Sequence, residues 1–220
     1  MELITDITES PRRPGRYVVS VAGRPGPTVS VETIERWKLA VGQPWEPVGA
    51  AVEREGTALA TYDRALNMLA ARARSRRELE RLLVRKGEPA DLAREAIRRL
   101  EQAGYLDDAE FARQFARAKA LGAGLARRRL AAELGRRGVE RAVADRAVDE
   151  VFVDERVDER EGVERLVRKR LASLAGLDPA TRRRRLYAYL ARRGYGPDLI
   201  RVAIERIDSE RESETDGEPV

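Results

Sequence analysis

Leucines four residues apart recur three times along the chain, and each recurrence ends in two cations and a glycine. The copies are LERLLVRKG at 79–87, LAAELGRRG at 130–138 and LYAYLARRG at 186–194. Side chains four residues apart share one face of a helix, so each copy predicts a helix with a buried stripe. The glycine predicts the left-handed residue that commonly ends a helix. The chain therefore contains a helical repeat.

Apolar residues follow each glycine at equivalent places, 5, 9, 10 and 13 residues further on. This spacing predicts a second helix after a tight turn. A similar pattern before each copy predicts a preceding helix, at about 60–72, 108–119 and 158–174. The glycines are 51 and 56 residues apart, a period typical of stacked supersecondary units. We therefore predict an all-α fold of three tandem three-helix repeats.

Several helix starts carry capping signals. Ser75 with Glu78 and Asp107 with Glu110 have the spacing of a capping box. Ala126 stands where the first repeat has Ser75, so its helix either lacks this cap or receives one from a neighbouring segment. Prolines expected in first turns are Pro89, Pro179 and Pro197.

The repeats divide the chain into five predicted segments. Repeat 1 covers 58–104, repeat 2 covers 105–152 and repeat 3 covers 153–207. Residues 1–57 form an N-terminal extension that is partly irregular or β. Residues 208–220 form an acidic tail, which we expect to be disordered because it lacks apolar residues to bury.

The N-terminal extension is expected to hold a small β-hairpin. Residues 1–15 are polar and proline-containing, which predicts disorder, while 17–21 and 28–31 are β-prone segments flanking a Gly/Pro turn. Two strands alone are marginal, so the hairpin must pack on the array. We expect Trp37 and Trp45 to anchor the extension on the first repeat; a partner-contact role is the alternative.

The positive charge belongs to the repeats. Net charge is −1 over residues 1–56, +11 over 57–207 and −5 over 208–220. Arginine supplies 39 of the 43 cations. An arginine-rich array suits phosphate backbones or an acidic protein groove. The alternative is that a GC-rich genome enriches arginine on solvated helix faces. The acidic tail is a candidate for shielding the charge of the array.

The residues needed for common catalytic sites are missing. The chain has no histidine and no cysteine, which excludes Ser-His and Cys-His nucleophiles, disulfides and His- or Cys-ligated zinc. It has no glycine-rich phosphate loop. Acidic pairs at 107–108, 154–155 and 158–159 are expected to be helix caps and solvated faces. We therefore expect no enzyme activity, no cofactor and no metal.

Aromatic residues give no sign of a sheet for stacking bases. Tyr105 and Tyr195 each follow a glycine that ends a helix, where an apolar side chain packs back on that helix. No zinc-finger spacing is present. A single repeat could form a helix–turn–helix, but three tandem copies favour an extended interaction surface. No apolar run reaches the length of a membrane helix and no signal-peptide pattern is present, so we expect a cytoplasmic protein without membrane contact.

The ordered motifs resemble the RecX family of regulatory proteins. Residues 65–79 (ALNMLAARARSRREL), 104–112 (GYLDDAEFA) and 130–138 (LAAELGRRG) carry the resemblance, and a weaker third copy follows. The resemblance covers about residues 60–207, whereas residues 1–57 show no firm match and are interpreted as a lineage-specific addition.

The resemblance implies a curved, elongated array of three three-helix repeats. It also implies binding to the RecA recombinase, in the groove of the RecA filament on single-stranded DNA, with modulation and mostly inhibition of its ATPase, strand-exchange and co-protease activities. Double-stranded DNA is a further expected partner, and the family expectation is a monomer.

Contact residues are expected among the exposed cations, about half of which we expect to be ordinary surface charges. The alternatives to RecA modulation are a general basic DNA-binding protein that needs no RecA, and a helical scaffold for another protein. The candidates are Arg76, Arg77, Arg85, Lys86, Arg127, Arg128, Arg136, Arg137, Arg182, Arg183, Arg192 and Arg193.

Overall fold

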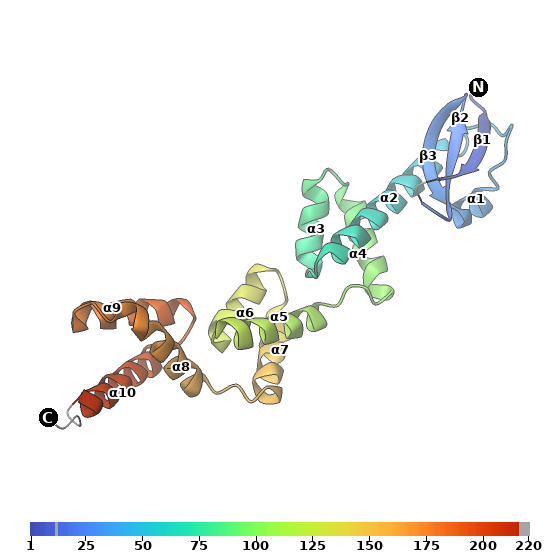
Figure 1. Ribbon diagram of the computed structural model, residues 1–220. Coiled ribbons are helices and arrows are strands. Elements are labelled where there is room, and N and C mark those ends of the chain that lie inside the picture. The colour runs from blue at the N-terminus through green and yellow to red at the C-terminus, as the bar shows by residue number, and fades with distance from the viewer. Residues whose placement is uncertain (12, 216–220) are drawn as a thin grey trace. The chain divides into compact units, whose positions relative to one another are not determined.

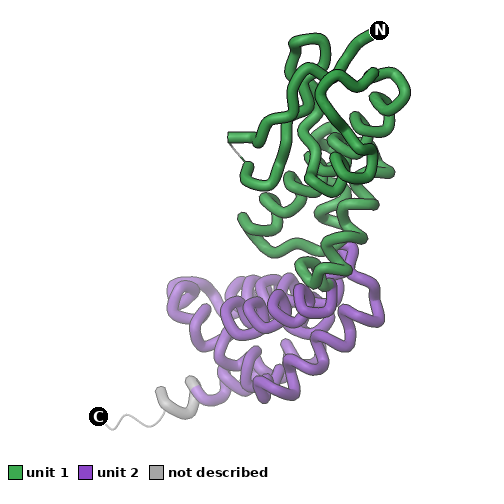
Figure 2. The backbone as a smooth tube through the Cα atoms, turned by 90° about the vertical axis from the view of Figure 1, so that its right-hand side faces the viewer, with its two compact units in different colours: residues 1–107 green, residues 108–220 purple. Residues whose placement is uncertain are grey.

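A computed structural model describes residues 1–11 and 13–215 of the chain. The chain divides into two compact units, residues 1–107 and the residues from 108 onward (Figure 2). The first unit holds a small β-sheet and three-helix repeat 1, and the second unit holds repeats 2 and 3 (Figure 1). The predicted helical fold with a small β extension is confirmed.

The sheet has three antiparallel strands in the order β1 (Ile4–Glu9), β2 (Arg16–Val21) and β3 (Arg24–Ser30). The hairpin formed by β2 and β3 corresponds to the predicted one but has a shorter turn, because β3 already begins at Arg24. The disorder expected for residues 1–15 is wrong for Ile4–Glu9, because β1 pairs with β2. The Ile4 side chain is only 1% exposed and its N–H donates to the Gln43 carbonyl at 2.9 Å, so burial and backbone pairing order this segment.

Two tryptophans hold the sheet against helix α2 (Gly49–Ala71). Trp45 is buried with Ile4 and other apolar residues of the sheet, and it lies so close to Gly49 that a side chain there would collide with its ring. Trp37, the last residue of α1 (Val31–Trp37), donates from Nε1 to Glu55 Oε1 at 3.0 Å. The tryptophans therefore anchor the extension on α2, which runs without a break through the boundary expected between residues 57 and 58.

Repeat 1 packs α2 against α3 (Arg76–Arg85) and α4 (Ala90–Gln102). Leu79 and Leu83, the leucines of the repeated motif, are completely buried. The capping box predicted at the start of α3 is present, since Ser75 Oγ accepts from the Glu78 N–H and the Glu78 side chain accepts from the Ser75 N–H. The sequence pattern thus gives both the start and the buried face of α3.

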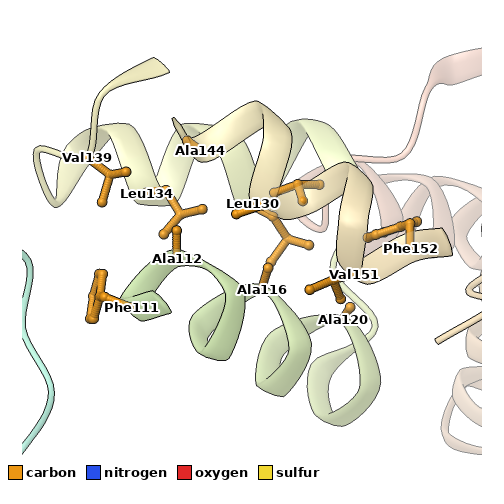
Figure 3. Close-up of a cluster of buried hydrophobic side chains, with 12 residues drawn as sticks. Phe111, Ala112, Ala116, Ala120, Leu130, Leu134, Val139, Ala144, Val151 and Phe152 are labelled. Atoms are coloured by element: carbon orange, nitrogen blue, oxygen red, sulfur yellow. The ribbon is translucent and has the colours of Figure 1, made fainter. Parts of the chain in front are cut away.

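Repeat 2 consists of α5 (Asp108–Ala123), α6 (Arg127–Arg136) and α7 (Arg141–Asp154). In the core of repeat 2, alanines of α5 face the two motif leucines of α6 (Figure 3). Because alanine is small, α5 and α7 approach closely, and leucine, valine and phenylalanine fill the remaining space. The labelled core residues are Phe111, Ala112, Ala116, Ala120, Leu130, Leu134, Val139, Ala144, Val151 and Phe152.

Repeat 3 consists of α8 (Glu159–Leu171), a short 3₁₀ turn (Ala172–Leu174), α9 (Pro179–Arg192) and α10 (Pro197–Thr215). The expected disorder from residue 208 is wrong as far as Thr215, because α10 continues to that residue. Its apolar face ends with Ile207 and is followed by a buried, ion-paired aspartate. Residues 216–220 of the predicted tail lie outside the described residues.

The two tyrosines that follow helix-ending glycines behave differently. Tyr195 is 4% exposed and packs in the core of repeat 3, as predicted. Tyr105 is 64% exposed, so its predicted packing is wrong. The next residue, Leu106, enters the core of repeat 1 instead, which leaves the tyrosine outside. Within the described part of the chain, no helix has the length and apolar character needed to cross a membrane.

Candidate functional site

The twelve cations predicted as contact residues fall into two groups. Five are exposed and make no ion pair or ring contact with the described residues: Arg77, Arg85, Lys86, Arg128 and Arg192. The other seven contact side chains of this chain: Arg76, Arg127, Arg136, Arg137, Arg182, Arg183 and Arg193. The cations of the second group therefore contribute to contacts within their own repeats.

One contact recurs in all three repeats. An arginine in the first turns of the second helix reaches the residue 25 positions later, in the second half of the third helix. Repeats 1 and 3 use an ion pair, with N–O distances of 3.5 and 2.7 Å, and repeat 2 places the guanidinium 4.2 Å from the centre of an aromatic ring. The pairs are Arg76 with Glu101, Arg127 with Phe152 and Arg183 with Asp208.

The start of the predicted acidic tail neutralises basic side chains of repeat 3. Asp208 is 7% exposed and pairs with Arg182 as well as with Arg183. Glu210 accepts hydrogen bonds from Arg168, and these lower the pKa of its carboxyl. Shielding by the acidic segment, the alternative raised by the sequence, is therefore observed for these two carboxylates.

Cations directly before the repeat glycines stack on aromatic rings in repeats 2 and 3. The Arg137 guanidinium lies 4.7 Å from the Phe115 ring centre, and the Arg193 guanidinium lies 4.2 Å from that of Tyr189. Such contacts contribute about 0.5–1 kcal/mol when exposed and more when desolvated. These two arginines therefore pack against their own repeats, whereas Lys86 at the equivalent place of repeat 1 is exposed.

The C-terminus of α9 meets the N-terminus of α6. The Arg193 carbonyl, at the end of α9, accepts from the N–H of Ala126, the residue that precedes α6, at 3.0 Å. Gly194 lies against Arg129 so closely that a Cβ atom would fall 2.5 Å from Arg129 Cβ. The two helices thus join end to end, although they belong to different repeats.

A carboxylate from α8 completes this junction. Ala126 provides no side-chain cap, and Glu159 Oε1 accepts from the Arg127 N–H at 2.9 Å. Of the two alternatives raised by the sequence, no cap or a cap from a neighbouring segment, the second is therefore correct. A carboxylate at this place also interacts favourably with the positive end of the α6 dipole.

The junction orders four exposed arginines along two helices. We call this set the arginine row: Arg184, Arg192, Arg128 and Arg136. Within each helix the two arginines are eight residues apart, which corresponds to about 12 Å along the axis. Only Arg136 has an ion-pair partner among the described residues, a 3.7 Å contact with Glu133. The row thus consists of four exposed arginines on two joined helices, three of them without an ion pair among the described residues.

Arg184 was missed by the sequence prediction, which selected its neighbours Arg182 and Arg183. Counting back from the repeat glycine identifies it, since Arg77, Arg128 and Arg184 all stand ten residues before that glycine. On α6, the exposed positions between the two arginines of the row are small, namely Ala132 and Gly135. Small side chains there leave room for a backbone to approach α6 closely.

Three carboxylates of the acidic pairs have structural roles. Glu155 pairs with Arg117 at 2.7 Å, Asp158 Oδ1 accepts from the Arg160 N–H at the start of α8, and Glu159 caps α6. Among the residues that the structure describes, no group of three or more metal-ligating side chains comes together.

A cavity of about 350 Å³ lies beside the junction, between repeats 2 and 3. Tyr195 lines it and donates from its hydroxyl to the Gly124 carbonyl at 3.2 Å. Burial, with a contribution from the Glu159 charge, raises the pKa of Tyr195 to about 12. Four cations and four carboxylates are among the lining residues, so the cavity has no clear preference for an anion.

Comparison with known proteins identifies all three repeats. Family models described as the first, second and third three-helix domains of RecX match residues 62–100, 107–148 and 158–204. A regulatory protein RecX from Mycolicibacterium vanbaalenii is 40% identical over 154 residues, which are 67% of this chain and 82% of the relative. The protein of the same name from Mycobacterium tuberculosis H37Rv is 37% identical over 171 residues, 76% and 95% of the two chains.

Solved structures share the fold. A crystal structure of regulatory protein RecX superimposes with a TM-score of 0.73 at 17% identity, covering 93% of this chain and all of the other. RecX from Lactobacillus salivarius gives a TM-score of 0.57 at 20% identity, covering 69% and 97%. The 93% coverage extends into residues 1–57, so the interpretation of this segment as a lineage-specific addition does not hold for its fold.

Proposed function

The chain belongs to the RecX family of regulatory proteins, and from this premise we propose that it binds the RecA filament on single-stranded DNA. It modulates the filament mostly by inhibiting ATP hydrolysis, strand exchange and co-protease activity, and it acts as a non-enzymatic monomer in the cytoplasm. The observation that carries the proposal is the arginine row. Four exposed guanidinium groups on two joined helices can meet the phosphates or the acidic protein surface of a filament.

The charge of the row is available for a partner. Arg128, Arg184 and Arg192 make no ion pair with the described part of the chain, in contrast to the arginines paired with Asp208. A partner therefore does not have to break an internal ion pair to engage these three. Arginine also suits bidentate contact with both phosphate and carboxylate, which fits a surface that meets DNA and protein together.

The test is DNA-dependent ATP hydrolysis by the cognate RecA on single-stranded DNA, with the protein titrated from well below one molecule per RecA. We expect inhibition at substoichiometric ratios, because one molecule then acts on an assembled filament. The double variant Arg128→Glu/Arg192→Glu should lose this inhibition. Arg146→Glu is the matched control, since Arg146 is exposed on α7, has no ion pair in the described part of the chain and lies outside the row.

A second candidate function is DNA binding without RecA, which the unpaired arginines also favour. The two functions differ in stoichiometry and in salt dependence. Pure phosphate binding weakens steeply with salt, with a slope of about 0.7 per neutralised phosphate on single strands. Inhibition seen only when the protein saturates the DNA would support this second function and contradict the first.

A further inference from the structure

Tyr187 on α9 is an exposed aromatic side chain beside cations. It is 41% exposed, while Leu186 and Leu190 of the same helix are completely buried. Two other tyrosines of the repeats, Tyr62 and Tyr189, have an arginine guanidinium stacked over the ring. No such contact covers Tyr187 within the residues that the structure describes. Its ring is therefore available to a ligand.

Tyr187 lines a groove between α9 and α10 with a volume of about 290 Å³. Ile204, 6% exposed and part of the repeat 3 core, gives the groove an apolar floor. The remaining lining residues are charged: Arg183, Arg184, Arg201 and Glu205. An aromatic wall, an apolar floor and a charged rim suit a flat, polar-edged ring.

The charges of the groove differ in availability. Arg183 is engaged by Asp208, and Arg201 pairs with Asp198. Arg184 is exposed and has no ion pair with the residues that the structure describes, and it is also the first member of the arginine row. Because the Glu205 carboxylate disfavours a phosphate inside the groove, a phosphate is better placed at Arg184 on the rim.

We propose that this groove binds an unpaired nucleobase of single-stranded nucleic acid, stacked on Tyr187, with an adjoining phosphate on Arg184. A basic track that follows the backbone, combined with an aromatic ring for a base, is how proteins hold single strands. A duplex keeps its bases stacked inside, so it can contact Arg184 but cannot offer a base to Tyr187. The inference rests on the DNA-binding part of the proposed function and adds the residues that hold a base and its phosphate.

The experiment measures binding of a fluorescein-labelled oligothymidylate by anisotropy, without RecA. The second probe is an abasic oligonucleotide of equal length, which has the same phosphates and no bases. Wild-type protein should favour the oligothymidylate. Tyr187→Ala should weaken oligothymidylate binding about five- to hundredfold and leave abasic binding unchanged. Tyr187→Phe should keep wild-type binding because its ring still stacks.

Two variants serve as controls. Arg184→Gln should weaken both probes alike and reduce the salt slope by about 0.7, as expected for one phosphate contact. Tyr105→Ala removes another exposed tyrosine, one followed closely by Asp107 and Asp108 instead of cations, and should change nothing. An unchanged urea midpoint for Tyr187→Ala shows that lost binding is not lost folding.

Equal wild-type binding of the two probes, or equal weakening of both by Tyr187→Ala, would overturn the groove proposal. The RecA assay separates this result from the proposed function. If the wild-type protein inhibits RecA but shows no base preference, the groove inference falls and the function stands. If the base preference is found without any effect on RecA, the groove inference stands and RecA modulation falls.

Discussion

The Arg183 guanidinium donates from Nε to Asp208 Oδ2 at 2.7 Å, joining the first turns of α9 to α10. Asp208 is 7% exposed and also pairs with Arg182, whose side chain is 17% exposed. One buried carboxylate thus compensates two arginines. The same carboxylate therefore affects both the stability of repeat 3 and the positive charge of α9 that is available to a partner.

Replacing Asp208 with Asn should therefore have two opposite effects. The free energy of unfolding should fall by about 1–3 kcal/mol, because the partly buried Arg182 loses its counter-charge. Affinity for single-stranded DNA should rise, because Arg182 and Arg183 become available to phosphates. Urea unfolding and anisotropy measure the two effects. Asp198→Asn, which removes an exposed pair with Arg201, should cost less than about 1 kcal/mol.

Two of the repeat glycines should differ in their tolerance of alanine. Gly87 and Gly194 have φ of +90° and +93°, so each substitution strains the backbone by about 1–2 kcal/mol. A Cβ at Gly87 would meet nothing within 4 Å, whereas a Cβ at Gly194 would lie 2.5 Å from Arg129 Cβ on another helix. Gly194→Ala should cost a further 1–3 kcal/mol or so by overpacking. Similar urea midpoints for Gly87→Ala and Gly194→Ala would contradict the end-to-end junction of α9 and α6.

Glu159→Ala should destabilise the second unit by about 1 kcal/mol, the usual effect of losing a helix N-cap. The capping residue of α6 lies on another repeat, so a local replacement should rescue the loss. Ala126→Ser restores the residue type that Ser75 provides in repeat 1. In a double-mutant cycle followed by urea unfolding, Glu159→Ala should cost less in the Ala126→Ser background. Equal costs in both backgrounds would show that Glu159 does not act as the cap.

Alkaline pH should destabilise the second unit through Tyr195. Its pKa is raised from 10.0 to about 12, so the folded protein disfavours the ionised ring. The stabilisation is complete below pH 10, and it is lost between about pH 10 and pH 12 at up to about 1.4 kcal/mol per pH unit. Tyr195→Phe should be about 1 kcal/mol less stable at neutral pH, having lost its bond to the Gly124 carbonyl.

The difference between Tyr195→Phe and the wild type should therefore shrink as the pH rises past 10. Urea unfolding at several pH values measures this trend. Tyr105→Phe provides the control, because Tyr105 is 64% exposed and should show a wild-type pH profile. A constant gap between Tyr195→Phe and the wild type would contradict the raised pKa.

The spacing of apolar residues predicted most of the helices of the three repeats. Local errors arose where two neighbouring residues could fill the same place. Tyr105 and Leu106 compete for the repeat 1 core and the leucine occupies it, whereas Tyr195 enters the repeat 3 core itself. Composition also mispredicted two segments: β1 is ordered by strand pairing, and Asp208 and Glu210 of α10 form ion pairs with arginines of repeat 3.

The candidate site was predictable only in part. Sequence identified exposed cations such as Arg85 and Arg192, because the positions before a helix-ending glycine lie on a helix terminus. It could not distinguish Arg192 from Arg193, although the first is exposed and the second stacks on Tyr189. That distinction depends on which side of the helix faces its neighbours, and adjacent residues point in directions about 100° apart.

By itself the sequence determined the repeat, the helices, their capping box at Ser75 and the concentration of positive charge on the array. These are local properties, set by spacing along one chain segment and by residue type. The tertiary structure decided which cations are available. Asp208 and Arg183 are 25 residues apart, and Arg193 and Ala126 come from different repeats, so their contacts follow from packing. Long-range pairing of this kind has no periodic pattern in the sequence, because it depends on how whole helices dock.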